Sequence, residues 1–229
     1  MPTTNIPWNK IFVVLQDWQQ GITEQGIELP SVSSLALETQ TNANKAWVVL
    51  VSTLISLRTK DEVTLSSSRR LLAEAPTPEM LLTLDTDHIA QLIYPAGFYR
   101  TKAKHLQKIA DILVHSYKGS VPDNMEALLR LPGVGRKTAN LVLSEGYDRE
   151  ALCVDTHVHR ICNRAGWVNT KTPDETEQVL RNILPSFYWR RTNWLLVLFG
   201  QRICRPQSPF CSRCPLASLC ERRGIDRSR

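Results

Sequence analysis

Apolar residues recur along most of the chain at the three- and four-residue spacing of an α-helix. The first apolar face is formed by Ile11, Val14, Leu15 and Trp18, and the second by Trp47, Leu50, Val51, Leu54 and Ile55. Further helical runs lie near residues 61–74, 78–83, 86–92, 101–117, 123–130, 136–145, 155–165, 173–184 and 189–200. The alternation of a β-strand never persists beyond a few residues, so the pattern predicts an all-α protein.

Two breaks in this pattern suggest two domains. Residues 19–44 are polar and rich in turn-forming residue types, and we expect them to form a loop between the N-terminal helix and the first long helix. The second break lies near residues 146–150. We therefore expect a central helical domain of residues 39–148, and a second domain in which residues 1–38 pack with residues 149–229.

The charge distribution suits a polyanionic partner. The 229 residues carry 28 Lys and Arg against 22 Asp and Glu, a formal net charge of +6. Nine arginines and no lysine lie in residues 190–229, where only Glu221 and Asp226 are acidic. Because a guanidinium binds phosphate through two parallel hydrogen bonds, this segment suits nucleic acid. A solvated basic tail is the alternative interpretation.

Membrane and secretion features are missing from the sequence. The longest apolar run, residues 46–57, has 12 residues, whereas a helix that spans a bilayer needs roughly 20. The N-terminal residues do not combine a basic segment with an apolar one, as a secretion signal does. We therefore expect no membrane partner and a reducing, cytoplasmic location, where clustered cysteines fit metal ligation better than disulfides.

Four of the six cysteines lie within 17 positions, and they are Cys204, Cys211, Cys214 and Cys220. Thiolates bind zinc, iron or iron–sulfur clusters, and structural zinc sites usually contain two short cysteine pairs or a cysteine pair with a histidine pair. Here a single C-x2-C pair is flanked by spacers of six and five residues, which favours a 4Fe–4S cluster over zinc. Cys153 and Cys162 lie outside this set, and we expect them to be buried core thiols.

The sequence predicts a helix-hairpin-helix motif over residues 123–146. Asp123 and Glu126 form a candidate capping box at the start of the first helix, which Pro132 ends. Gly146 is a candidate glycine at the end of the second helix. The hairpin itself is the segment LPGVGRKTA, residues 131–139.

The hairpin carries a candidate phosphate site. Gly133 and Gly135, with Val134 between them, allow positive φ and a close approach of the backbone to a ligand. The amides at the start of the second helix, together with Arg136, then favour an anion such as a DNA phosphate. A helical turn that simply needs glycines is the alternative.

Lys137 is the candidate nucleophile. A lysine in the first turn of a helix opposes the helix dipole, so its position needs another explanation. We expect the positive helix end and the neighbouring Arg136 to disfavour the ammonium form, which leaves the free amine that a Schiff-base nucleophile requires. A second phosphate contact is the alternative. Asp155 lies 18 residues after Lys137 and is a good N-cap for a helix that starts at Thr156.

Three motifs together, LPGVGRKTA, VDTHVHR at residues 154–160 and the cysteine set, resemble the endonuclease III family of helix-hairpin-helix DNA glycosylases. The resemblance covers about residues 46–222. It implies two helical lobes: a central barrel-like domain with the hairpin, and a second lobe that holds one 4Fe–4S cluster, with a DNA cleft between them. It also implies a monomeric base excision repair enzyme that removes oxidised pyrimidines from double-stranded DNA and cleaves abasic sites by β-elimination.

The resemblance assigns roles to several residues. Asp155 would face the flipped nucleotide beside Lys137 and take part in catalysis, which is compatible with capping a helix. His157 matches a residue at the DNA interface of the family, and a surface histidine without a special role is the alternative. Arg205, in the loop between the first two cluster ligands, would contact phosphate.

Two loops resemble the segments that the family inserts into DNA. In GFYRTKA, residues 97–103, Phe98 is the expected apolar wedge, Arg100 and Lys102 are candidate phosphate contacts, and a core role for Phe98 is the alternative. The segment 56–61 departs from the family, because the glutamine that meets the opposite base is missing. Leu57 or Arg58 takes its place; an arginine is able to hydrogen-bond a guanine, whereas a leucine only fills space.

Two other functions fit parts of the sequence. One is a related glycosylase that removes adenine opposite oxidised guanine, but that enzyme lacks a lysine at the position of Lys137. The other is a non-enzymatic DNA-binding or electron-carrying iron–sulfur protein, which would bind DNA and never form a covalent adduct.

Overall fold

The computed structural model describes residues 6–26, 29–39 and 42–229, and all regular elements in these ranges are helical. The all-α prediction is confirmed. Contacts divide the chain into two compact units, Pro30–Ala151 and the combination of Met1–Leu29 with Leu152–Arg229. No helix among the described residues is long and apolar enough to cross a bilayer.

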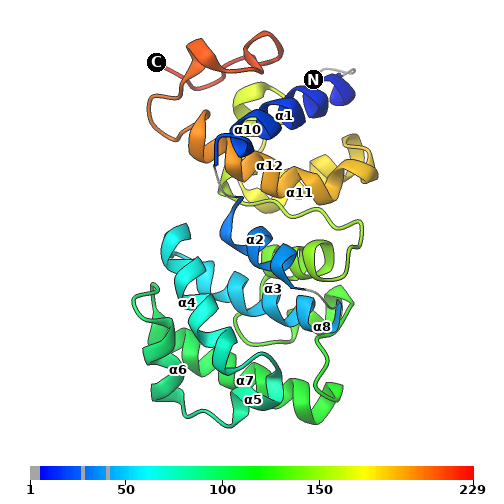
Figure 1. Ribbon diagram of the computed structural model, residues 1–229. Coiled ribbons are helices and arrows are strands. Elements are labelled where there is room, and N and C mark those ends of the chain that lie inside the picture. The colour runs from blue at the N-terminus through cyan, green and yellow to red at the C-terminus, as the bar shows by residue number, and fades with distance from the viewer. Residues whose placement is uncertain (1–5, 27–28, 40–41) are drawn as a thin grey trace. The chain divides into compact units, whose positions relative to one another are not determined.

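The helices of the unit Pro30–Ala151 pack around helix α3 (Asn42–Ser56). Its helices are α2 (Ser31–Glu38), α3 (Asn42–Ser56), α4 (Asp61–Glu74), α5 (Pro78–Leu82), α6 (Thr86–Ile93), α7 (Tyr99–Tyr117), α8 (Met125–Leu129) and α9 (Arg136–Leu141). Helix α3 contacts α2 and α4 (Figure 1), and it also contacts α7 and α9. Trp47 of α3 is fully buried, and its indole N–H donates to the Ala75 carbonyl at 3.2 Å. A buried indole with its N–H satisfied anchors α3 in this core.

Helix α2 corrects two expectations from the sequence. Residues 19–44 are not all loop, because α1 continues to Thr23 and residues 31–38 form α2. Val32, Leu35 and Ala36 of α2 are buried, and its Ser31 hydroxyl donates to Asp61 of α4 at 2.7 Å. Since α2 packs on α3 and α4, the unit begins at Pro30 rather than at residue 39. Its other boundary lies at Ala151 rather than at residue 148.

The second unit joins the two ends of the chain. Its helices are α1 (Trp8–Thr23), α10 (Thr156–Ala165), α11 (Pro173–Ile183) and α12 (Trp189–Arg202), followed by short 3-10 turns at Cys211–Arg213 and Ala217–Leu219. Helix α12 contacts both α1 and α10 (Figure 1). The core between them contains Ile11, Leu15, Val158, Ile161, Leu196 and Phe199.

The place of α2 in the core generates a stability prediction. Leu35 is 4% exposed and Leu37, on the same helix, is 72% exposed. We expect Leu35→Ala to lower the free energy of unfolding by about 2 to 5 kcal/mol, because it opens a cavity against α3 and α4. Leu37→Ala is the matched control and is expected to change it by less than about 0.5 kcal/mol. Denaturant unfolding measures both, and equal effects would place α2 outside the core.

Candidate functional site

The hairpin is formed by α8 and α9, and its first helix starts one residue later than predicted. Asn124, rather than Asp123, caps α8 and accepts from the Ala127 amide at 2.9 Å. Asp123 instead forms an ion pair with Arg149. The predicted capping box of Asp123 and Glu126 is therefore wrong, because a distant arginine engages the carboxylate.

Only the first glycine of the hairpin has the predicted positive φ. Gly133 has φ 77°, whereas Gly135 has φ −98°. A Cβ on Gly133 would lie 2.6 Å from Nδ1 of His105, but a Cβ on Gly135 would meet nothing within 4 Å. Val134 is buried and its amide donates to the Leu131 carbonyl at 3.1 Å, so neither its side chain nor its amide is available to a phosphate. Gly133, Gly135 and Arg136 are exposed, and of the two glycines only Gly135 has open space around it.

Lys137 lies in the first turn of α9 and is half-buried. No side-chain cap closes the start of this helix at Gly135. The helix continues from Val142 as a π-helical turn that ends at Gly146. Gly146 is not a left-handed cap: a Cβ there would approach the Ala46 Cα to 2.9 Å, so close packing on α3 explains the glycine. Lys137 is thus mounted on a helix that packs firmly against the centre of its unit.

The predicted helix cap at Asp155 is confirmed. One carboxylate oxygen of Asp155 accepts from the amides of His157 at 2.8 Å and Val158 at 3.0 Å. The side chain is 8% exposed. A carboxylate at a helix N-terminus is stabilised by the amides and by the helix dipole. Asp155 therefore carries its charge in a fixed orientation, in the unit that does not contain Lys137.

His157 is oriented by an arginine that also contacts the cysteine loop. The Arg160 guanidinium donates to Nδ1 of His157 at 3.0 Å and to the carbonyls of Cys204 at 3.0 Å and Gly200 at 3.3 Å. Because a guanidinium only donates, Nδ1 is the acceptor and a neutral His157 carries its proton on Nε2. A Cβ on Gly200 would lie 2.5 Å from Nδ1, so this glycine makes room for the histidine.

Phe98 is an exposed residue in a left-handed turn and not a core aromatic. It is 63% exposed, has φ 57° and directly precedes α7. Arg58, which also has a left-handed φ of 53°, places its guanidinium 5.5 Å from the centre of the Phe98 ring. Leu57 is half-buried beside it, so Arg58 is the residue of this pair that is exposed. Arg100 is exposed as well, over the ring of Tyr99 at 5.6 Å.

Lys102 is buried, so the phosphate contact expected of it is wrong. It is 7% exposed, and its Nζ donates to the carbonyls of Ile55 and Leu57, each at 2.6 Å, and to the Thr59 hydroxyl at 2.8 Å. Burial lowers the pKa of Lys102 from 10.5 to about 8, so the ammonium form still predominates at neutral pH. The sequence does contain a sign of this, because Lys102 lies four and seven residues before Leu106 and Ile109, on the buried face of α7.

A hollow of about 390 Å³ brings these loops and the hairpin together within the unit Pro30–Ala151. Its lining residues come from α3, from both loops, from α7 and from the hairpin, and they are Leu54, Leu57, Arg58, Phe98, Thr101, Lys102, His105 and Gly133. The hollow is therefore bounded by the two loops that resemble inserting segments and by the candidate phosphate-binding turn.

The four predicted metal ligands line one narrow apolar cavity of about 30 Å³. Burial raises the pKa of Cys214 to about 11 and also raises the pKa of Cys220. The Arg164 guanidinium approaches the Cys204 sulfur at 3.6 Å, and the Arg222 amide donates to the Cys220 sulfur at 3.4 Å. Such donors stabilise thiolates, as metal binding requires.

Within the described ranges, no three His, Cys, Asp or Glu side chains converge as ligands of a single metal ion. Cys153 and Cys162 are buried away from the cavity, as predicted, and burial raises the pKa of Cys162.

Arginines from outside the loop between Cys204 and Cys211 add positive charge beside it. The guanidinium groups of Arg205, Arg213 and Arg229 surround the ring of Phe210 at 5.0, 4.0 and 5.3 Å from its centre. The backbone of Arg229 bonds to the loop, with its amide on the Pro209 carbonyl at 2.8 Å. The sequence predicted a phosphate contact for Arg205 alone. The arginine-rich composition of residues 190–229 was the only sign that Arg213 and Arg229 belong to the same basic surface.

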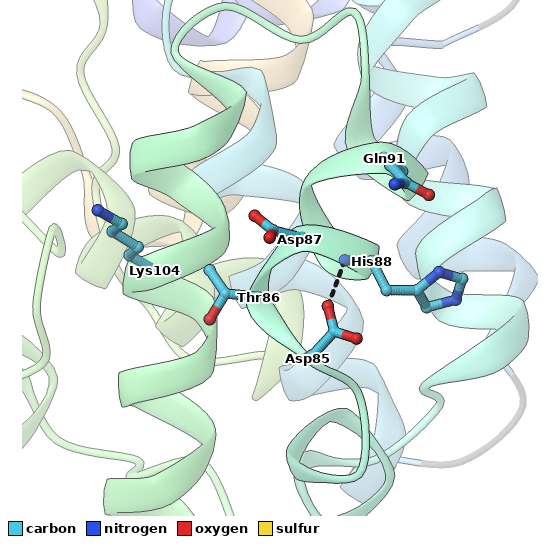
Figure 2. A pocket seen from close by; sticks show the side chains of 6 residues that line it. All are labelled: Asp85, Thr86, Asp87, His88, Gln91 and Lys104. Atoms are coloured by element: carbon cyan, nitrogen blue, oxygen red, sulfur yellow. Dashed lines mark hydrogen bonds between the residues drawn. The ribbon is translucent and has the colours of Figure 1, made fainter.

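A polar hollow at the start of α6 is a separate feature (Figure 2). Asp85 caps α6 and accepts from the His88 amide at 2.7 Å, and the His88 ring bonds to Glu74 at 2.7 Å. These side chains already stabilise the helix start, and Lys104 reaches the same hollow from α7. Neither the hairpin nor the two exposed loops contribute residues to it.

Comparisons with known proteins point in one direction. Residues 51–186 match the model of the HhH-GPD superfamily base excision DNA repair proteins. Endonuclease III of Thermotoga maritima is 50% identical over 173 residues, which cover 76% of this chain and 81% of that protein. Endonuclease III homolog 2, chloroplastic, of Arabidopsis thaliana is 44% identical over 185 residues, and the chain spans about half of it, 48% of its length.

A solved structure of similar fold is described as a trapped endonuclease III–DNA covalent intermediate, an estranged-adenine complex. It superimposes with a TM-score of 0.77 at 30% sequence identity, and the match covers 95% of this chain and 97% of that one.

Proposed function

The chain belongs to the endonuclease III family, and we propose that it acts as a monomer on oxidised pyrimidines and abasic sites in double-stranded DNA, with Lys137 as the nucleophile. The family places it among the DNA glycosylases with AP lyase activity in base excision repair. One observation carries the assignment of Lys137: a half-buried lysine lies in the first turn of a helix that no side chain caps.

The proposed reaction begins with attack of the Lys137 amine on C1′ of the extruded nucleotide. The bond between C1′ and the base breaks as the bond to nitrogen forms, and the base leaves with a proton. The product is an aminal, whose C1′–O4′ bond then breaks while O4′ takes a proton and the nitrogen loses one, which leaves an imine. The imine is the electron sink for β-elimination, in which C2′ loses a proton and the 3′ phosphate departs, so the strand is cut on the 3′ side. The trapped covalent DNA intermediate of the solved relative supports a covalent step of this kind.

Asp155 is proposed to stabilise the positive charge that develops at C1′ and to assist proton transfer. The geometry supports this role, because its carboxylate is fixed by two amides and therefore needs no reorganisation during the reaction. A charge that is already oriented stabilises the transition state more than a charge that must first be ordered.

Several exposed groups are proposed to bind the DNA backbone. Gly133, Gly135 and Arg136 form the hairpin contact, and Arg100 lies beside the exposed loop. In the other unit, Nε2 of His157 is the proton-bearing nitrogen, and the three arginines around Phe210 form a basic surface. These contacts are independent of base sequence, as repair of scattered lesions requires.

Phe98 and Arg58 are proposed to enter the duplex. Phe98 is the apolar wedge, since its ring is exposed without being part of a core. Arg58, rather than Leu57, is proposed to meet the opposite base, since it is the exposed member of the pair. A guanidinium pairs well with the acceptors of guanine, so we expect a preference for lesions opposite guanine.

Cys204, Cys211, Cys214 and Cys220 are proposed to hold one 4Fe–4S cluster. The set of four thiols in one apolar cavity suits an iron–sulfur cluster, and the spacers of six and five residues around a single C-x2-C pair differ from the paired spacing of structural zinc sites. When bound, the cluster would supply four bonds that fix a segment too short to form a core. The phosphate contacts around Phe210 would depend on that rigidity.

A borohydride trapping experiment tests the function. With a duplex that contains an abasic site or an oxidised pyrimidine, the parent protein is expected to form a covalent adduct when borohydride reduces the imine. Lys137→Ala is expected to abolish the adduct and to slow strand cleavage by at least roughly a thousandfold. Lys108→Ala, which removes an exposed lysine of α7, is the control. A parent protein that binds the duplex without an adduct would support the non-enzymatic alternative.

The Asp155→Asn variant removes the negative charge of residue 155 but keeps its ability to cap α10. Asparagine caps a helix about as well as aspartate, so the free energy of unfolding is expected to change by less than about 0.5 kcal/mol, whereas Asp155→Ala is expected to lower it by about 1 kcal/mol. Base removal by Asp155→Asn in a single turnover is expected to be about 100-fold slower, with little change in duplex affinity. Parallel losses of rate and affinity would reduce Asp155 to a cap.

The cluster is tested by metal analysis and visible absorbance. The purified protein is expected to contain about four irons per chain and to be coloured. Cys211→Ser is expected to lose the visible absorbance and to unfold at a lower temperature, while Cys162→Ala, outside the cavity, is expected to keep the colour. A colourless protein with one equivalent of zinc would contradict the assignment.

A further inference from the structure

Lys102 joins the ends of two helices that bear the exposed loops. The carbonyls of Ile55 and Leu57 lie at the C-terminal end of α3, where backbone acceptors lack partners within the helix. The Lys102 ammonium donates to both of them, at 2.6 Å each. A cation at this end also interacts favourably with the helix dipole. Lys102 itself lies in the first turn of α7, four residues after Phe98.

Thr59 closes the same network from the other side. Its hydroxyl accepts from Nζ of Lys102 at 2.8 Å and from the amide of Gly97 at 3.1 Å. A Cβ on Gly97 would overlap the Arg58 carbonyl, so the two loops are in direct backbone contact. One buried ammonium and one hydroxyl therefore connect the Leu57–Thr59 loop to the Gly97–Phe98 turn.

Two residues next to these bonds, Arg58 and Phe98, have a strained backbone conformation. Arg58 and Phe98 have left-handed φ values of 53° and 57°, a conformation that is unfavourable for residues other than glycine. Such conformations persist only where the surroundings determine them. Here they orient the Arg58 guanidinium and the exposed Phe98 ring toward each other, 5.5 Å apart, at the edge of the hollow that reaches the hairpin.

We propose that Lys102 is a positioning residue, which fixes the Leu57–Thr59 loop against the Gly97–Phe98 turn so that Arg58 and Phe98 enter the duplex as one preformed wedge. This inference rests on the proposed function, since it assigns how the base is extruded. Lys102 has no contact with the DNA in this proposal. Its ammonium acts only through the two loops, and loss of its three hydrogen bonds leaves the wedge residues without a defined separation.

The test compares Lys102→Met, which keeps the apolar stem and removes the ammonium, with Lys108→Met, which removes an exposed charge from the same helix. Two duplexes are cleaved in single turnovers, one with an oxidised pyrimidine paired to guanine and one with a ready-made abasic site. We expect Lys102→Met to be about 100-fold slower on the paired lesion, because misplacing a positioned group by about 1 Å has that effect. On the abasic site, where no base must be extruded, the loss is expected to be less than about tenfold.

A second measurement reports insertion without cleavage. The base opposite the lesion is replaced by 2-aminopurine, whose fluorescence rises when it is unstacked. The parent and Lys108→Met are expected to raise the fluorescence, whereas Lys102→Met is expected to lose most of the rise while its affinity for undamaged duplex is unchanged. A purely structural role would lower the affinity and the rate on both substrates together.

Thr59→Val keeps the proposal testable if Lys102→Met does not fold. Valine has nearly the shape of threonine but offers no acceptor to Lys102 or to the Gly97 amide. A Thr59→Val protein with a normal melting curve is expected to show the same selective defect on the paired lesion. The proposal is overturned if either folded variant keeps both the parent rate and the fluorescence rise. A parent protein that forms no adduct and cleaves neither duplex would instead reject the proposed function.

Discussion

Charged side chains bonded to backbone groups hold the irregular segments of this protein in place. Lys102 binds carbonyls at the end of α3, and Asp155 binds amides at the start of α10. Arg160 and Arg164, both on α10, bind carbonyls of the loop that begins at Cys204. A buried backbone group without a partner costs about 1 to 3 kcal/mol, so these bonds decide which conformation each segment adopts. The two exposed loops, the start of α10 and the loop that begins at Cys204 each depend on one of them.

This arrangement follows from how little apolar surface the functional segments contain. The helices bury their apolar faces, as Trp47 does in one unit and Phe199 in the other. The loops around Arg58 and Arg205 leave these side chains exposed and have little to bury. Because packing is unable to fix such loops, long charged side chains reach them from neighbouring helices. Helix ends thereby become rigid mounts for groups that must stay at the surface.

The sequence predicts what depends on local pattern and fails where distant residues decide. Most helices were predicted within a few residues because their apolar spacing is intrinsic, and the Asp155 cap was predicted because the aspartate directly precedes its helix. Helix α2 was missed, since its eight residues gain a buried face only by packing on α3 and α4. Asp123 failed as a cap because Arg149 engages it, and Lys102 was assigned to the surface because its partners lie 43 to 47 residues away.

Arg58 shows how a fixed backbone and an adaptable side chain are combined. Its left-handed backbone lies between Leu57 and Thr59, which both accept hydrogen bonds from the buried Lys102 ammonium, and these bonds are strong because the donor is charged. Its stacking on Phe98, by contrast, is an exposed cation–π contact, worth about 0.5 to 1 kcal/mol. If Arg58 and Phe98 enter the duplex as proposed, a base pair that is being opened would displace the side-chain contact easily, while the backbone would stay in place. In that proposal, the interaction energy with DNA would be available for unstacking the base, since little of it would be needed to order the loops.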